Sequence, residues 1–279
     1  MKIKIYLLII SFNLFGIGFD AIEIYTYPND LSLSGAGVAS RDLFYNNPAI
    51  SHREKSTISF SANRYTEYSS SGNSLFYSKG SFLFSLNSQK IDDIEIRDDI
   101  PSDEPLDIIE LPFLSFGLSK GFQINDNTNI GLGAHFYYSD LWIKKDTELT
   151  LNFGFKKIFF DNFQLGFMVK NFSFNDSEIP TNYISGISYL NSKYNTELLL
   201  DYNYSAGYHN GFHLGVIQKI KIITINLGYS SNTTDILRTT ISSGLQIDIN
   251  KNYKFLYSIL SHLNTNLGLS HYFGIEISI

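Results

Sequence analysis

The sequence predicts an all-β protein: a single fourteen-stranded antiparallel transmembrane β-barrel. Three observations support this fold class. From about residue 56 to the end, apolar and polar residues alternate in short segments separated by Asn, Asp, Gly and Ser turns. Aromatic residues make up 15% of the 279 residues, as suits strands and interfacial aromatic belts. Short and long connections alternate along the chain, as in a barrel with turns at one rim and loops at the other.

The alternation is clearest in residues 130–139 and 149–156. In the first segment, the even positions carry Ile, Leu, Ala, Phe and Tyr, and the odd positions carry Gly, His, Tyr and Ser. In the second, the odd positions are Leu or Phe, and the even positions are Thr, Asn, Gly and Lys. Because successive side chains of a strand point to opposite faces, each segment has one apolar face for lipid and one small or polar face for the lumen.

The predicted strands follow one another with few long interruptions. They cover residues 56–66, 74–79, 81–90, 111–122, 128–143, 147–159, 163–173, 182–191, 195–204, 211–219, 222–231, 239–250, 253–261 and 266–279. The connections after every second strand are short, and the longest of the others runs from Ile91 to Glu110. An even strand number brings both termini to one side, and short turns are typical of the periplasmic rim.

The first residues have the pattern of a secretory signal. Lys2 and Lys4 precede an apolar run over residues 5–19, and Gly16 and Gly18 are small residues suited to cleavage after Gly18. We therefore expect a signal peptide over residues 1–18, although an uncleaved anchor helix is the alternative. Since this run is short for a membrane span and no later segment approaches 18 uninterrupted apolar residues, membrane residence would depend on strands.

Composition and motifs exclude several functional classes. The chain has no cysteine, and its net charge of −6 gives no basic stripe for nucleic acid. No nucleophile elbow, phosphate-binding loop or zinc-protease helix occurs, so we expect no enzyme activity and no cofactor. His209 and His213 are too far apart in a strand to share a zinc ion, and the acidic loop over residues 92–110 lacks an EF-hand spacing. We expect no metal site.

A soluble β-sandwich or jelly roll is the main alternative fold, because its strands also alternate. Two packed sheets rarely leave so many Gly and Ser residues on the second face of each strand. The phase of the charged residues favours the barrel: Glu197, Asp201 and Glu276 all fall on the inward set, where a carboxylate avoids lipid.

Residues 31–50 resemble the opening of the PorV/PorQ family of outer-membrane proteins, relatives of the FadL-type fatty acid transporters. In that family a Gly-Gly-Ala-x-Val-Ala stretch precedes Asn-Pro-Ala before the first strand. The residues that match these two motifs are Gly35, Ala36, Val38, Ala39, Asn47, Pro48 and Ala49. Ser34 stands in place of the first glycine, and the spacer between the motifs is shorter. The acidic excursion after strand three, Lys170-Asn171 and the Leu-Gly-Leu-Ser-His ending at 267–271 extend the resemblance along the chain.

The resemblance implies a barrel in the bacterial outer membrane, over residues 55–279, with residues 19–54 folded into the lumen as a hatch or plug. A lumen of this width needs such a filling, since about eight strands is the most that wall side chains alone can fill. For the family, the implied role is handling of exported proteins in type IX secretion, with cargo or secretion components as partners. The alternative is FadL-like passage of hydrophobic small molecules, for which the inward Leu83, Met168, Leu199 and Leu256 could line a greasy pocket. An aqueous porin is disfavoured because no opposing charge rings are visible.

Overall fold

The structure is a computed structural model that describes residues 26–41, 43, 45–65, 70–96, 104–140, 144–174, 179–205, 210–232, 239–263 and 269–279. The predicted signal segment, residues 1–18, lies outside the described residues, and so does His209. None of the described residues belongs to a helix long and apolar enough to cross a membrane.

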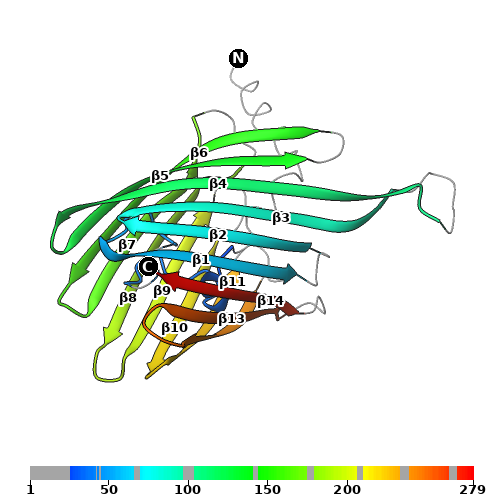
Figure 1. Cartoon of the computed structure of the whole chain (residues 1–279). Helices are drawn as coiled ribbons and strands as arrows, with labels where there is room; N and C mark the ends of the chain where they lie inside the picture. The colour runs from blue at the N-terminus through cyan, green and yellow to red at the C-terminus, as the bar shows by residue number, and fades with distance from the viewer. Residues whose placement is uncertain are drawn as a thin grey trace, which may run out of the picture.

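Fourteen antiparallel strands close into a barrel (Figure 1). Each strand pairs with its neighbours in sequence, and β1 pairs with β14 over Thr57 to Tyr65 to complete the ring. The strands are β1 (Arg53–Tyr65), β2 (Ser70–Gly80), β3 (Phe82–Ile96), β4 (Asp107–Asn125), β5 (Thr128–Asp140), β6 (Lys145–Phe159), β7 (Phe163–Phe172), β8 (Asn182–Asn191), β9 (Thr196–Ser205), β10 (Gly211–Ile220), β11 (Ile223–Asn232), β12 (Thr240–Asp248), β13 (Tyr253–His262) and β14 (Leu269–Ser278). The predicted closed, fourteen-stranded antiparallel barrel is confirmed.

The largest difference from the predicted strands lies in the β3–β4 hairpin, which extends well beyond the other strands on the right of Figure 1. The sequence predicts a loop from Ile91 to Glu110, but β3 continues to Ile96 and β4 begins at Asp107. After Ile91, β3 has lost its pairing with β2 and pairs with β4 alone. Asp93, with φ of 61°, forms a bulge that shifts the apolar-polar alternation by one residue. The strand pattern in the sequence therefore breaks at this point, although β3 continues.

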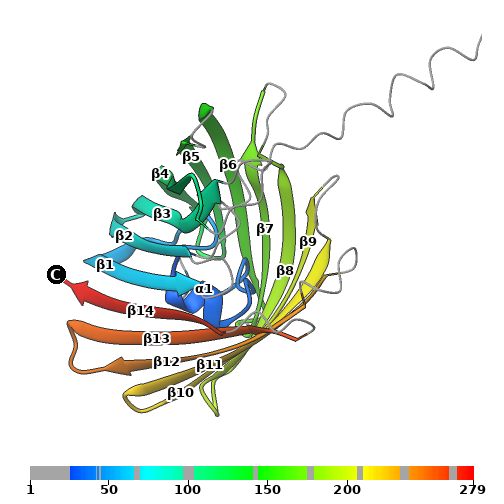
Figure 2. The same ribbon diagram turned by 90° about the vertical axis from the view of Figure 1, so that its right-hand side faces the viewer.

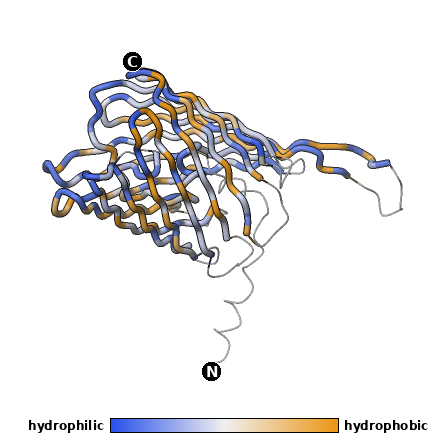
Figure 3. The backbone as a smooth tube through the Cα atoms, turned by 90° about the horizontal axis from the view of Figure 1, so that it is seen from below, coloured by the Kyte–Doolittle hydropathy of each residue, from blue (hydrophilic) through white to orange (hydrophobic). Residues whose placement is uncertain are grey.

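The two faces of the wall separate apolar from polar residues, as the alternation predicts. Large apolar side chains are exposed on the outer face of every strand, and Figure 3 shows the resulting alternation of colour along each one. Strands β7 to β14 are nine or ten residues long, which is the length of a tilted strand that crosses a bilayer. The inward set is mostly small or polar, with Glu197, Asp201 and Glu276 among its members, and it also includes buried apolar residues such as Leu83 and Leu256.

The hydrophobic core forms between the inner face of the wall and residues 26–50, which we call the N-terminal segment. Its helix α1 (Pro28–Ser32) lies within the ring of strands, against β11 to β14 (Figure 2). One cluster joins Tyr27 and Ile50 to Phe76, Leu83 and Leu256 of the wall. A second joins Leu33, Ala36 and Leu43 to Leu199 and Ile217, and a third joins Leu31 to Leu260 and Tyr272.

Candidate functional site

The contact between the N-terminal segment and the inner wall is the candidate site. It begins with α1, which has Pro28 in its first turn, where a missing backbone N–H costs no hydrogen bond. The helix ends in a tight turn: Ser34 and Gly35 have positive φ, and the Gly35 N–H donates to the Asp30 carbonyl at 2.8 Å. Gly37 follows with φ of 139°, a conformation that side chains rarely adopt. These residues turn the chain back across the barrel.

The turn after α1 is held by a buried carboxylate of β9. The backbone N–H groups of Gly37 and Val38 both donate to Asp201 Oδ2, at 2.6 and 2.8 Å. Asp201 is fully buried, so these hydrogen bonds replace the water that a carboxylate needs. Bonds to a charged acceptor contribute roughly 1.5–3 kcal/mol each, which makes Asp201 a strong anchor for the Gly-rich motif.

A second carboxylate of β9 holds the next stretch of the segment. Glu197 accepts hydrogen bonds from Ser40 Oγ at 3.1 Å and from the Arg41 N–H at 3.2 Å. On the opposite side, Lys156 Nζ of β6 donates to the carbonyls of Ser40 and Leu43. The backbone of the segment is therefore bound by wall groups of both charges: the carboxylates accept hydrogen bonds from its amides, and the lysine donates hydrogen bonds to its carbonyls.

Asn47 joins the middle and the C-terminal end of the segment to the wall. Its Nδ2 donates to the Val38 carbonyl at 2.9 Å and lies within hydrogen-bond distance of the carbonyls of Phe155 and Phe167. Its Oδ1 accepts from the Ala49 N–H at 2.9 Å, across Pro48. Asn47 is buried, and Pro48 favours the extended backbone that places its side chain. The Asn-Pro-Ala stretch is therefore a buried junction of the segment and strands β6 and β7.

Inward glycines of the wall let the backbone of the segment approach closely. A Cβ added at Gly121 would lie 2.0 Å from the Ile50 carbonyl oxygen, and one at Gly131 would lie 2.0 Å from the Pro48 carbonyl. One added at Gly166 would lie 2.4 Å from the Val38 carbonyl oxygen, and one at Gly228 would lie 2.3 Å from the Leu33 carbonyl carbon. Real Cβ contacts below 3.0 Å essentially do not occur, so these positions accept only glycine while the segment stays in place.

Hydroxyls and a histidine bind the α1 end of the segment. Ser34 Oγ lies 2.7 Å from Ser242 Oγ, and the Ser34 carbonyl lies 2.6 Å from His213 Nδ1. At the other end of α1, the Tyr27 hydroxyl donates to Glu276 at 2.9 Å. The wall partners belong to β10, β12 and β14, so this end of the segment contacts one side of the ring, from β10 to β14.

Asp30 of α1 is an acidic group whose buried surroundings disfavour its charge. Burial raises the pKa of Asp30 to about 7, although the charge of Lys170 and a hydrogen bond with Asn46 act in the opposite direction. Its Oδ1 has no hydrogen-bond partner among the described residues. Burial also raises the pKa of Tyr27 and of Tyr45, so both phenols stay protonated. The docked segment is therefore most compatible with a neutral Asp30.

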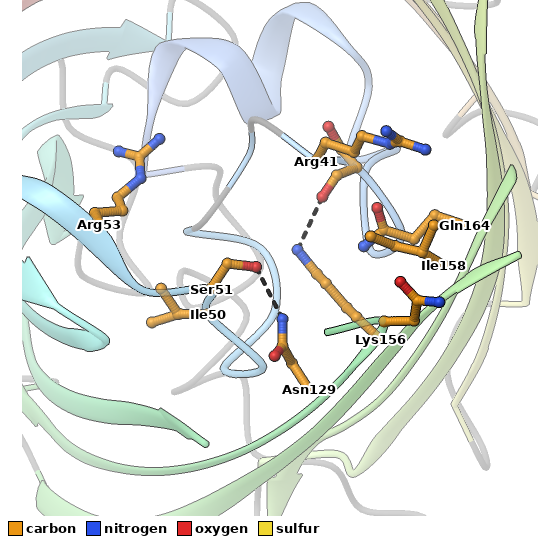
Figure 4. Close-up of a pocket in the computed structure, with 10 residues that line it drawn as sticks. Arg41, Ile50, Ser51, Arg53, Asn129, Lys156, Ile158 and Gln164 are labelled. Carbon is orange, nitrogen blue, oxygen red and sulfur yellow. Dashed lines mark hydrogen bonds between the residues drawn. The ribbon is translucent and has the colours of Figure 1, made fainter. Parts of the chain in front are cut away.

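A small polar cavity lies at the end of the barrel that carries the short turns, with a volume of about 150 Å³ (Figure 4). Arg41 and Arg53 contribute to its lining together with Lys156, whose Nζ reaches the N-terminal segment. Ser51 accepts a hydrogen bond from Asn129 at its edge. The cavity is too small and too polar to serve as a binding pocket for a hydrocarbon ligand.

All seven residues of the predicted motif lie in the N-terminal segment. Gly35 lies at the turn after α1, Ala36, Val38, Ala39 and Ala49 are buried, and Asn47 is the buried junction beside Pro48. Of the predicted apolar candidates, Leu83, Leu199 and Leu256 pack in the clusters that the segment completes, and Met168 is buried outside them. These leucines are covered by the segment.

The sequence did not identify the wall residues that hold the segment. The sequence places Glu197 and Asp201 on the inward face, and the structure shows that both accept hydrogen bonds from backbone amides of the segment. The signal available was the run of inward Gly residues, because glycine in a strand often marks close approach of another backbone. Within the described parts of the chain, His, Asp and Glu form no group that could hold a metal ion.

Comparison with solved structures finds the same barrel in transporters of low sequence identity. The toluene transporter TodX of Pseudomonas putida matches with a TM-score of 0.66 and 10% identity, over 91% of this chain and 97% of that chain. The toluene transporter TbuX of Ralstonia pickettii matches with 0.60 and 12%, over 92% and 98%, and a FadL homologue of Pseudomonas aeruginosa with 0.58 and 11%, over 91% and 98%. No family model and no curated protein matches the sequence. The chain therefore has the fold of these FadL-like transporters.

Proposed function

We propose that the protein is a bacterial outer-membrane channel for small hydrophobic molecules and that the N-terminal segment closes it at rest. The observation that carries the proposal is the seating of this segment on inward glycines and buried carboxylates of the wall. The likeness of the barrel to two toluene transporters and a FadL homologue supports this ligand class. We assign residues 19–54 to the plug and residues 55–279 to the barrel, after a signal peptide over residues 1–18.

The outer face supports residence in a membrane. A closed barrel satisfies its backbone hydrogen bonds between strands, so it can lie in hydrocarbon without unpaired groups. Exposed Leu, Ile, Phe and Tyr side chains cover the outer face of all strands, and such an area is far larger than a soluble protein tolerates. Since barrels of this type occur in bacterial outer membranes, we place the protein there.

The contacts of the segment suit a plug that can move. Its anchors are hydrogen bonds to Asp201, Glu197, Lys156 and the Asn47 junction, and water can replace each of these when the segment leaves the wall. No covalent bond or shared strand ties it to the barrel within the described residues, apart from the direct continuation into β1. We therefore assign the gating role to the motif Gly35, Ala36, Val38, Ala39, Asn47, Pro48 and Ala49.

Displacement of the segment would also create the surface that a hydrophobic ligand needs. Leu83, Leu199, Ile217 and Leu256 of the wall are buried against it in two clusters. If the segment moves, these side chains line the lumen and can contact an apolar ligand. The closed channel therefore excludes polar solutes, and the open channel offers apolar surface.

Transport is tested in Gram-negative cells that display the protein in the outer membrane. We expect these cells to take up radiolabelled toluene faster than cells without the protein, while hydrolysis of external nitrocefin by a periplasmic β-lactamase stays at the control rate. A variant lacking residues 26–50 should admit both compounds, provided that it still migrates as a heat-modifiable barrel. Equal toluene uptake with and without the protein would reject the hydrophobic channel.

A role of the PorV/PorQ type, in which the barrel assists type IX secretion of exported proteins, is the second candidate. One observation favours it: the segment packs tightly against the wall, and the cavity at its end holds only about 150 Å³. A barrel whose segment never leaves the wall serves as a scaffold for cargo or secretion components rather than as a channel. This candidate predicts no toluene uptake by the intact protein, together with retention of a secretion component when the barrel is purified in mild detergent.

A further inference from the structure

Basic residues predominate at the rim of short turns, which also carries Asp126, Asp161 and Asp248, and acidic residues predominate at the other rim. The rim of short turns carries lysines in or beside most of its turns, at Lys79, Lys193, Lys219, Lys221 and Lys251. Toward the other rim, carboxylates are more numerous, among them Asp92, Glu110, Asp140, Asp146 and Glu148, and several of them pair with Lys90, Lys144 or Lys145. In a membrane, the leaflet at the short-turn rim would therefore meet more positive charge, and the leaflet at the other rim would meet more negative charge.

Two further lysines of the short-turn rim lie on the outer face of the strands and rest on aromatic rings. Lys120 of β4 pairs across the sheet with Phe82, and its Nζ lies 4.6 Å from the centre of that ring and 5.1 Å from that of Phe122. Lys157 of β6 lies 4.8 Å from the centre of the Phe159 ring. Such cation–π contacts hold an ammonium at a fixed place without neutralising its charge.

These lysines differ from those of the other rim in their partners. Lys90 pairs with Asp92 at 2.8 Å and with Glu110 at 3.2 Å, and Lys145 pairs with Asp140 at 2.8 Å. Among the described residues, neither Lys120 nor Lys157 has a carboxylate within ion-pair distance. Their positive charge is therefore available to a ligand on the outer face.

The surroundings of Lys120 and Lys157 match the headgroup level of a bilayer. Phe82, Phe122 and Phe163 are exposed beside them, and the outward residues nearest the short turns in β3 to β9 include no carboxylate. Aromatic rings prefer this level of a membrane, and lysines there reach toward lipid phosphates. Each lysine would offer one anionic headgroup a fixed ammonium group above an apolar surface for its acyl chains.

We propose that Lys120 and Lys157, with their aromatic platforms, bind anionic phospholipid headgroups in the leaflet at the short-turn rim. The inference rests on the proposed membrane residence of the barrel and adds a lipid class and an orientation to it. A lysine close to an anionic surface contributes about fivefold to binding, so each of the two sites should prefer an anionic headgroup about fivefold.

Native mass spectrometry of the folded chain without its predicted signal tests the proposal. The protein is released from micelles that contain equal amounts of dioleoylphosphatidylglycerol and dioleoylphosphatidylcholine, and the ratio of the two bound lipids is measured. We expect a preference for phosphatidylglycerol that falls roughly twofold in Lys120→Gln or Lys157→Gln and about fivefold in the double variant, because each substitution removes one of two separate sites. Lys120→Arg with Lys157→Arg should keep the preference, since arginine binds phosphate and aromatic rings as well.

Lys90→Gln with Lys145→Gln is the matched control, because it removes the same charge from the other rim. A double variant of Lys120 and Lys157 that keeps the wild-type lipid ratio would overturn the proposal, and so would an equal loss in the control. The same variants are also folded into dioleoylphosphatidylcholine vesicles. If wild type inserts but shows no preference for phosphatidylglycerol, the lipid site alone is rejected, whereas failure to insert into any vesicle rejects membrane residence as well.

Discussion

Adding one methyl group at Gly131 should release the N-terminal segment from the wall. The Cβ of Gly131→Ala would lie 2.0 Å from the carbonyl carbon and oxygen of Pro48 and 2.3 Å from the Ala49 backbone nitrogen. Ordinary contact begins at 3.4 Å, so the backbone of the segment must move by 3.4 − 2.0 = 1.4 Å or the segment must leave. Overpacking of a rigid contact costs about 1–3 kcal/mol, and this cost falls only on the docked state.

Gly133→Ala is the matched control on the same strand. Its Cβ would meet Ser119 Oγ at 2.5 Å, a side-chain atom that can rotate away, and would not meet the N-terminal segment. Both changes face inward and have the same effect on strand propensity. A difference between Gly131→Ala and Gly133→Ala therefore reports the contact with the segment.

A single cysteine reports whether the segment is docked. The chain has no cysteine, and Val38 is only 2% exposed, so Val38→Cys places a smaller, hidden thiol in the segment. With docking weakened by 1–3 kcal/mol, the exposed population, and with it the rate of maleimide labelling in folded barrels, should rise roughly 5- to 150-fold in Gly131→Ala. Equal labelling rates for Gly131→Ala and Gly133→Ala would refute the reasoning, because the Pro48 backbone could then not lie against β5.

Three further changes test the other anchors, each measured by labelling of Val38→Cys. Asp201→Ala leaves two buried amides without their acceptor and should weaken docking by about 3 kcal/mol or more, a labelling increase above 100-fold, whereas Asp201→Asn keeps an acceptor and should lose much less. Asn47→Ala removes the junction with β6 and β7 and should cost roughly 1–3 kcal/mol; unchanged labelling would show that the junction is not formed. Asp30 binds its proton more tightly in the docked state, with a pKa of about 7 against the ordinary 3.8, so docking is strongest below about pH 4 and weakens as pH rises to about 7. The ratio of labelling rates in wild-type and Asp30→Asn backgrounds cancels the titration of the thiol and should rise over that range; a flat ratio would contradict the burial of Asp30.

The barrel could be predicted because each strand carries its own signal. Alternation over ten residues fixes which face meets lipid, and the charged Glu197, Asp201 and Glu276 appear on the inward face as expected. The alternation is interrupted at the bulge of Asp93, so the sequence did not predict the long β3–β4 hairpin.

The contacts of the N-terminal segment could not be predicted in the same way. It has no strand period, and its partners lie far along the chain: Asp201 is 164 residues from Gly37, and Ser242 is 208 residues from Ser34. Local patterns do not show which inward side chain meets which backbone amide. The glycines of the wall were visible in the sequence, but their meaning depends on the segment that covers them.

Single-channel conductance in planar bilayers tests the central claim most directly. The chain without its predicted signal is compared with a variant that also lacks residues 26–50, after both have been shown to migrate as heat-modifiable barrels. The account predicts no sustained current through the intact barrel and stable current steps through the variant, because the segment fills the lumen at rest. Equal, stable conductance through both proteins would contradict it, since a segment that leaves the ion path unchanged does not close the barrel.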